Sequence, residues 1–167
     1  MMGNDAQRLS LLARLVLAAL ILLLITGIVM HGITVEIILR IWHDIIDRPS
    51  GPMAFRFILQ PVMAAIAAIL HGRRDARNGR SPYFWTLMSK PQERIGRLRE
   101  GFNATARVIL LGIVMDVIYQ IIVLKRFYPA ESVIVALLLG FLPYLVLRGI
   151  VTRVLLVWYR SNSPRQV

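Results

Sequence analysis

The sequence predicts an all-α membrane protein with four transmembrane helices, one outer amphipathic interfacial helix and one inner amphipathic interfacial helix. Of its 167 residues, 57% are apolar and only 17% are charged, whereas about a quarter of the residues of a soluble domain are charged. Residues 15–35 contain no Asp, Glu, Lys or Arg. A helix of that length crosses a hydrocarbon core of about 30 Å, so a membrane anchor is expected there.

The four predicted spans cover residues 15–35, 53–71, 107–125 and 131–148, within a single membrane domain over residues 1–160. The second span is complete only if Arg56 snorkels outward from its end, and it contains Pro61. The third span carries Asp116, and the fourth is interrupted by Pro143. Both prolines are typical of membrane helices, where a plain kink is the favoured interpretation.

Two connecting segments have the apolar periodicity of interfacial helices. Residues 36–48 alternate isoleucines and Trp42 with charged residues at helical spacing, and Pro49 follows this segment. Residues 89–102 begin with Ser89 and Gln92, which predict a capping box, and continue with an apolar stripe against arginines. The tail, residues 161–167, is predicted to be disordered.

The distribution of positive charge predicts the orientation. The chain carries 20 Lys and Arg against 9 Asp and Glu, and nine of these bases lie between Arg73 and Arg107. Cytoplasmic segments of membrane proteins are enriched in Lys and Arg. We therefore expect this segment and both termini to lie in the cytoplasm.

Asp116 is the sharpest candidate site because it is predicted near the middle of the bilayer. A central aspartate is unfavourable by about 2.5–3.5 kcal/mol, so it needs a proton, a hydrogen bond or a polar interior. Tyr119 and Gln120 lie on its helical face, and Gln60 on the second span is a further candidate partner. These four residues form the predicted intramembrane polar site. Interhelical hydrogen bonding and a proton or substrate site are both open interpretations, with the former slightly favoured.

The basic loop is the second candidate site. Arg73, Arg74, Arg77 and Arg80 crowd eight positions directly after the second span, and such clusters bind anionic headgroups at about 1 kcal/mol per base. The alternative, which we favour, is that they serve only as the topology signal. The neighbouring aromatic residues suit a membrane interface, so nucleic acid is not an expected partner.

Catalytic residues, metal ligands and cofactors are not predicted. The chain has no Cys, which excludes thiolate metal sites and cysteine nucleophiles, and no hydrolase, zinc-protease or P-loop motif is present. His43, Asp44 and Asp47 have one-turn spacing, but a salt-bridged solvated face is the favoured interpretation.

Four blocks carry a resemblance: residues 55–61 (FRFILQP), 75–85 (DARNGRSPYFW), 116–120 (DVIYQ) and 143–149 (PYLVLRG). In these blocks the chain resembles a group of small bacterial integral inner-membrane proteins with no known activity. The resemblance covers about half of the chain. It implies a stand-alone multi-pass protein of the bacterial cytoplasmic membrane, and it implies no cofactor and no catalytic residue.

The leading functional hypothesis is a non-enzymatic accessory or assembly protein that packs against partner helices and anionic lipid. It includes self-association or a partner membrane protein, since four short spans bury little surface alone. The alternative is a small proton- or solute-coupled transporter or channel that uses Asp116. A further alternative is a membrane enzyme that acts on lipid.

Overall fold

The chain is all-helical in the part that the computed structural model describes, residues 9–32, 35–47 and 53–162. Its α-helices are α1 (Leu11–His31), α2 (Val35–Asp47), α3 (Arg56–Arg77), α4 (Tyr83–Ser89), α5 (Pro91–Tyr119), α6 (Pro129–Ala136) and α7 (Leu142–Asn162). Two π-helical segments, η3 (Gln120–Leu124) and η4 (Leu137–Phe141), continue α5 and connect α6 to α7. The predicted fold class is confirmed at this level.

The predicted number of four spans is wrong. In the described residues, three helices are long and apolar enough to cross a membrane: Leu11–His31, Pro91–Leu124 and Pro129–Asn162. Residues 56–71 of the predicted second span lie in α3, which is long enough at 22 residues. However, α3 carries Arg56 and Gln60 near its start and His71 and Arg73 near its end, and these lower its mean hydropathy. Three candidate membrane helices still indicate a multi-pass membrane protein.

Local sequence signals explain where these helices begin and end. The Ser10 hydroxyl accepts a hydrogen bond of 3.2 Å from the Ala13 amide and caps α1, as serine does at helix starts. Gly32 ends α1 with φ +71°, a backbone conformation that only glycine adopts readily. Pro91 and Pro129 are the first residues of α5 and α6, where proline replaces an amide that has no helical partner.

The predicted outer interfacial helix corresponds to α2, and residue 48 lies outside the described residues. This helix also packs on the helical bundle. The Ile45 side chain is buried against Val135 and Leu139, and the Arg40 guanidinium lies 3.4 Å from the centre of the Tyr128 ring. One side of α2 is therefore covered by protein.

The predicted inner interfacial helix, residues 89–102, is not a separate element. Ser89 is the last residue of α4, and Lys90 precedes α5 without a side-chain cap. From Pro91 onward a single helix of 29 residues runs into the predicted third span. The capping box therefore does not form, because Pro91 starts the helix two residues later.

The C-terminal helix is also longer than expected. Helix α7 includes Ser161 and Asn162, the first two residues of the predicted disordered tail, and residues 163–167 lie outside the described residues. The predicted interruption at Pro143 takes the form of η4, directly before α7. Since proline lacks an amide and displaces the helical carbonyl before it, a widened π turn at this point has a physical cause.

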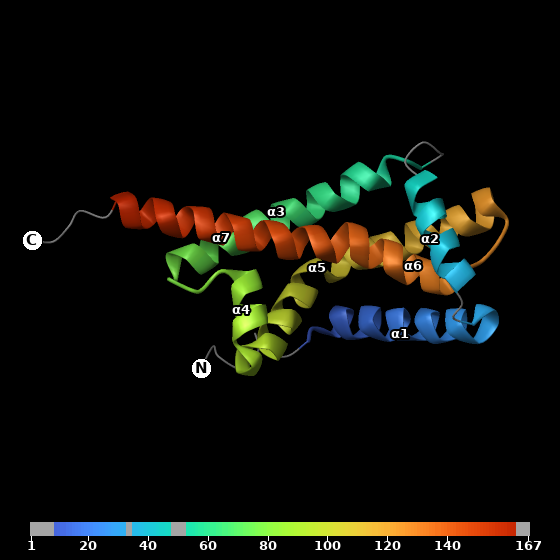
Figure 1. Cartoon of the computed structure of the whole chain (residues 1–167), viewed down its shortest axis with the longest axis horizontal. Coiled ribbons are helices and arrows are strands. Elements are labelled where there is room, and N and C mark those ends of the chain that lie inside the picture. The colour runs from blue at the N-terminus through green and yellow to red at the C-terminus, as the bar shows by residue number, and fades with distance from the viewer. Residues whose placement is uncertain (1–8, 33–34, 48–52, 163–167) are drawn as a thin grey trace, which may run out of the picture.

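Small residues let the helices approach closely. Helices α3 and α7 lie side by side over much of their length (Figure 1). At this contact Ala64 and Ala68 are fully buried, as their small-xxx-small spacing predicts. A Cβ atom on Gly72 would lie 2.9 Å from the Val151 side chain, and one on Gly112 would lie 3.2 Å from Ala136.

The main apolar core joins the candidate spans. It consists of Ala13, Val16 and Leu20 on α1, Ala106, Ile109 and Ile113 on α5, and Val133 and Ala136 on α6. Helix α4, the beginning of α5 and the end of α7 lie toward one end of the molecule, and α1 begins on the side that faces them (Figure 1). Helix α2 lies at the other end (Figure 1). We call the end that contains α4 and residues 73–107 the basic end.

Candidate functional site

Asp116 forms a buried ion pair with Arg56. Both side chains are at most 1% exposed, and the Arg56 Nη1 and Asp116 Oδ1 atoms are 2.9 Å apart. This pair joins α5 to the first turn of α3. The expectation that Arg56 snorkels outward is therefore wrong: its guanidinium turns into the protein because a carboxylate there compensates for its desolvation.

Gln120 extends this contact to the beginning of α6. Its Nε2 atom donates to Asp116 Oδ2 at 2.8 Å and to the Ser132 hydroxyl at 3.1 Å. Its Oε1 atom accepts from the Tyr128 amide at 2.7 Å. A single amide side chain thus connects α5, the α5–α6 connection and α6. The predicted interaction of Gln120 with Asp116 is confirmed.

Tyr119 and Gln60 occupy different places in this cluster. The Tyr119 ring lies under the Arg56 guanidinium, with 4.7 Å between the guanidinium carbon and the ring centre. Gln60 is 1% exposed, yet neither of its amide atoms has a hydrogen-bond partner within the described part of the chain. Of the candidate partners of Asp116, Gln60 therefore does not bond to it, although Gln60 does lie in the interior beside Gly112.

A second buried ionic cluster, which we call the Arg148 cluster, lies toward the basic end. The Arg148 guanidinium is fully buried and contacts two carboxylates through its Nη2 atom, Asp75 at 2.7 Å and Glu100 at 2.7 Å. Asp75 lies on α3, Glu100 on α5 and Arg148 on α7. This cluster therefore ties three helices together.

Two more arginines reach the same carboxylates. Arg97 Nη1 lies 3.2 Å from Asp75 Oδ1 and 3.7 Å from Glu100 Oε2. The more exposed Arg80 contacts the same two oxygen atoms at 3.7 and 3.8 Å. Asp75 thus has three arginines around it, and the Arg148 cluster carries one more cation than it has carboxylates.

Aromatic hydroxyls complete the Arg148 cluster. The Tyr144 hydroxyl accepts from Arg148 Nη1 at 2.7 Å and lies 3.0 Å from His71 Nδ1. The Tyr83 hydroxyl donates to the Arg97 carbonyl oxygen, and the Arg148 guanidinium lies 4.3 Å from the centre of the Tyr83 ring. Burial raises the pKa of Tyr83, so this phenol keeps the proton that it donates.

The sequence reasoning missed most of this cluster. Arg148 and Asp75 are 73 residues apart, and Arg148 was expected only to bound the fourth span. The signal available in the sequence was the charge itself: ten of the eleven residues between Arg148 and Arg160 are uncharged, which places Arg148 inside a long apolar helix. A buried arginine needs a carboxylate.

The four arginines predicted to bind anionic lipid all have exposed side chains. Arg80 takes part in the Arg148 cluster. Arg73, Arg74 and Arg77 lie on the last turns of α3, and no ion pair involves them among the described residues. Their charge is available at the surface of the basic end.

The metal interpretation of residues 43–47 is not tested, because the side chains of Asp44 and Asp47 lie outside the described residues. His43 is exposed on α2. Among the side chains that the structure does describe, no group of three His, Cys, Asp or Glu residues could hold a metal ion.

The chain matches no protein-family model, and it has no significant match among the curated proteins or the solved structures.

Proposed function

We propose that this protein is a non-enzymatic accessory or assembly protein of the bacterial inner membrane, with its basic end at the cytoplasmic face. Its basic end binds anionic lipid headgroups, and its apolar surface packs against partner helices or a second copy. The observation that carries this proposal is the contrast between the buried arginines of α3, α5 and α7 and the exposed arginines at the end of α3.

The buried arginines each have a carboxylate beside them. Arg56 lies 2.9 Å from Asp116, Arg97 lies 3.2 Å from Asp75, and Arg148 lies 2.7 Å from Asp75. Such pairs hold helices together and leave little net charge in the interior. They support a structural role for these ionisable groups rather than a catalytic one.

Arg73, Arg74 and Arg77 differ because they are exposed and have no ion pair within the described residues. They project from the end of α3 near α4, whose Phe84, Trp85 and Met88 side chains are more than half exposed. Aromatic residues beside cationic ones are typical of a membrane interface. This juxtaposition supports binding of anionic lipid at the cytoplasmic leaflet.

The proposed packing against other helices is supported by the apolar surface of α1. Only 22% of an 18-residue apolar stretch of α1 is buried inside the protein. Leu15, Leu22, Ile25 and Val29 are all at least half exposed. In a membrane such a surface contacts either lipid chains or another helix.

The lipid proposal is tested with the full-length protein in mild detergent, by counting retained phosphatidylglycerol and phosphatidylcholine with native mass spectrometry. The double variant Arg73→Gln/Arg74→Gln removes two charges from the basic end. At about 1 kcal/mol per arginine, we expect its affinity for phosphatidylglycerol to fall by more than about tenfold. Phosphatidylcholine retention is expected to stay unchanged.

The matched control is Lys125→Gln/Arg126→Gln, which removes two exposed charges in the α5–α6 connection at the opposite end. We expect it to retain phosphatidylglycerol like the unmodified protein. Equal losses in the two double variants would show that only net charge matters, and would contradict a specific role for the basic end.

A transporter is the second candidate, favoured by the buried amide of Gln60, which has no hydrogen-bond partner in the described part of the chain. An unsatisfied polar group inside a helical bundle is unfavourable and is typical of polar pathways. This proposal requires solute flux in proteoliposomes that is lost in Gln60→Leu. The accessory proposal requires no flux above that of empty vesicles.

A further inference from the structure

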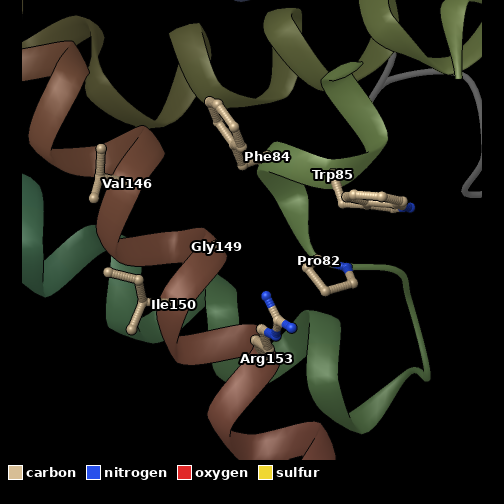
Figure 2. A pocket seen from close by; sticks show the side chains of 7 residues that line it. All are labelled: Pro82, Phe84, Trp85, Val146, Gly149, Ile150 and Arg153. Atoms are coloured by element: carbon tan, nitrogen blue, oxygen red, sulfur yellow. The ribbon is translucent and has the colours of Figure 1, made fainter. Parts of the chain in front are cut away.

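A groove between α4 and α7 has a lining that the ionic clusters do not use. Its volume is about 670 Å³, within the range of about 300–1,000 Å³ that is typical of small-molecule sites. Figure 2 shows its walls. They include Phe84 and Trp85 from α4, and Val146, Gly149, Ile150 and Arg153 from α7.

The groove is apolar except at one point. Phe84, Trp85, Val146 and Ile150 are each between 45% and 65% exposed, so their apolar surfaces face the groove or the surroundings. The Arg153 guanidinium points toward the cavity (Figure 2). A long apolar wall with one cation fits a molecule that has an apolar chain and a single anionic group.

Arg153 lacks the carboxylates that serve its neighbour on the same helix. Arg148, just over one turn earlier, is fully buried and paired with Asp75 and Glu100. Arg153 is exposed, and no ion pair involves it among the described residues. Its charge therefore remains available to an anion outside the protein.

The position of Arg153 along α7 makes such an anion favourable. Trp158 is 54% exposed and packs against Tyr159, with their ring centres 5.2 Å apart. Aromatic pairs of this kind mark the headgroup level of a membrane. Arg153 lies five residues earlier, about 7.5 Å deeper along the helix, where an arginine is unfavourable unless it reaches a phosphate.

We infer that the α4–α7 groove binds one acyl chain of an anionic glycerophospholipid, with the lipid phosphate on Arg153. This inference rests on the proposed function and deepens it, because it names a site apart from the exposed arginines of α3. Charge complementarity at Arg153 selects an anionic lipid over a zwitterionic one.

The size of the groove supports an acyl chain as the occupant rather than a partner helix. A three-turn helix, roughly 10 Å wide and 16 Å long, fills more than about 1,200 Å³, which exceeds the groove. At the floor, α4 and α7 are already close, since a Cβ atom on Gly149 would lie 3.4 Å from Phe84 Cβ. A helix therefore cannot enter without separating them.

The test uses Trp85 as a reporter inside the groove. The chain has three tryptophans, so Trp42→Phe and Trp158→Tyr leave Trp85 alone. This full-length variant is reconstituted into phosphatidylcholine vesicles that contain either brominated phosphatidylglycerol or brominated phosphatidylcholine at the same fraction. Bromine on an acyl chain quenches tryptophan fluorescence on contact. We expect phosphatidylglycerol to be preferred by roughly fivefold, because one arginine near a lipid with a net negative charge contributes about 1 kcal/mol, whereas the choline cation of phosphatidylcholine offsets its phosphate.

Three further variants in this background examine the groove. Arg153→Gln is expected to abolish the preference for phosphatidylglycerol, and Arg160→Gln, a control on the exposed end of the same helix, is expected to keep it. Ile150→Phe narrows the groove and is expected to reduce quenching by both lipids. Because Ile150 and Arg153 are exposed, both variants are expected to fold.

Several outcomes overturn the inference. Equal quenching by the two lipids, or an unchanged preference in Arg153→Gln, shows that no anionic headgroup binds there. Loss of the preference in excess inorganic phosphate shows that free phosphate is the ligand. A second copy of the chain that covers the groove would protect Trp85 from both lipids. In that case quenching is weak and rises when the protein is diluted into more lipid, because dilution separates the copies.

The two lipid proposals fail separately. The double variant Arg73→Gln/Arg74→Gln in the Trp85 background is expected to keep the full quenching preference at the groove. Loss of the preference in this variant assigns the selectivity to the α3 arginines and overturns the groove as an independent site.

Discussion

At the scale of single residues, the structure gives Asp116 an ion-pair partner that the sequence did not predict. An acidic group in the interior was predictable from the sequence, and so was its contact with Gln120 one turn later. The pairing of Asp116 with Arg56 was not predictable, because the two residues are 60 positions apart. The sequence placed Arg56 at the outer end of the second span and Asp116 in the middle of the third. The buried pair makes Asp116 a structural element of the α3–α5 contact.

This pair predicts a specific result for substitutions. Asp116→Asn keeps the amide contact with Gln120 but removes the carboxylate 2.9 Å from Arg56, so a buried cation loses its counter-charge. We expect a loss of about 3 kcal/mol in the free energy of unfolding, and a similar loss for Arg56→Gln. The measurement is unfolding in mixed micelles followed by circular dichroism.

The double variant Arg56→Met/Asp116→Leu is the decisive comparison. This variant removes both charges and replaces them with apolar side chains of similar size. We therefore expect it to be more stable than either single variant. Strictly additive losses would contradict a direct interaction between the two side chains.

At the scale of helices, the sequence predicted where the apolar helices lie better than it predicted which segments form one continuous helix. Most of each of the apolar runs that predict spans 15–35, 107–125 and 131–148 lies in one helical segment: residues 15–31 in α1, residues 107–124 in α5–η3 and residues 131–148 in α6–η4–α7. Residues 33–34 of the first predicted span lie outside the described residues. The separation of residues 89–102 from the third span was wrong because α5 continues through the change from a polar to an apolar surface. Burial of Arg97 against Asp75 favours this continuation, and local periodicity does not reveal it.

Glycines at helix contacts give a second prediction. A Cβ atom on Gly27 would lie 2.5 Å from Ala130, so Gly27→Ala forces α1 away from α6. We expect it to destabilise the protein by about 1–3 kcal/mol, as overpacking does. The measurement is the thermal midpoint in detergent.

Gly96→Ala is the matched control for this substitution. Gly96 is exposed on α5, and a Cβ atom there meets nothing within 4 Å. Alanine is the better helix former by about 1 kcal/mol, so this variant should be slightly more stable. A stabilising effect of both substitutions would contradict the close α1–α6 contact.

At the scale of the whole molecule, the packing of the helices places the arginines between α3 and α5 at one end. The end of α7 lies toward that same end, and α1 begins on the side that faces it (Figure 1). The positive-inside bias supports the proposed cytoplasmic position of this end. Within the described residues, three helices qualify as spans by length and composition. Helix α3 brings the chain back along α7, with Arg56, Gln60 and Asp75 buried in the bundle.

The proposed orientation is tested by single-cysteine labelling, since the chain has no cysteine of its own. Asn78→Cys and Ser161→Cys place a thiol at the basic end, and Arg126→Cys places one at the opposite end. In cells with a permeabilised outer membrane, we expect an impermeant maleimide to label only Arg126→Cys. After lysis it should label all three. The reverse pattern would contradict the orientation.

The sequence by itself determined the helical class, the positions of the apolar stretches and the basic connection. The free energy of transferring a helix into lipid depends on the composition of that stretch of sequence, so neighbouring residues are enough to predict it. The tertiary structure decided which buried charges meet, which helix bears polar residues inward and where the α4–α7 groove opens. These features depend on contacts such as that between Asp75 and Arg148, 73 residues apart, which form only when separate helices pack together.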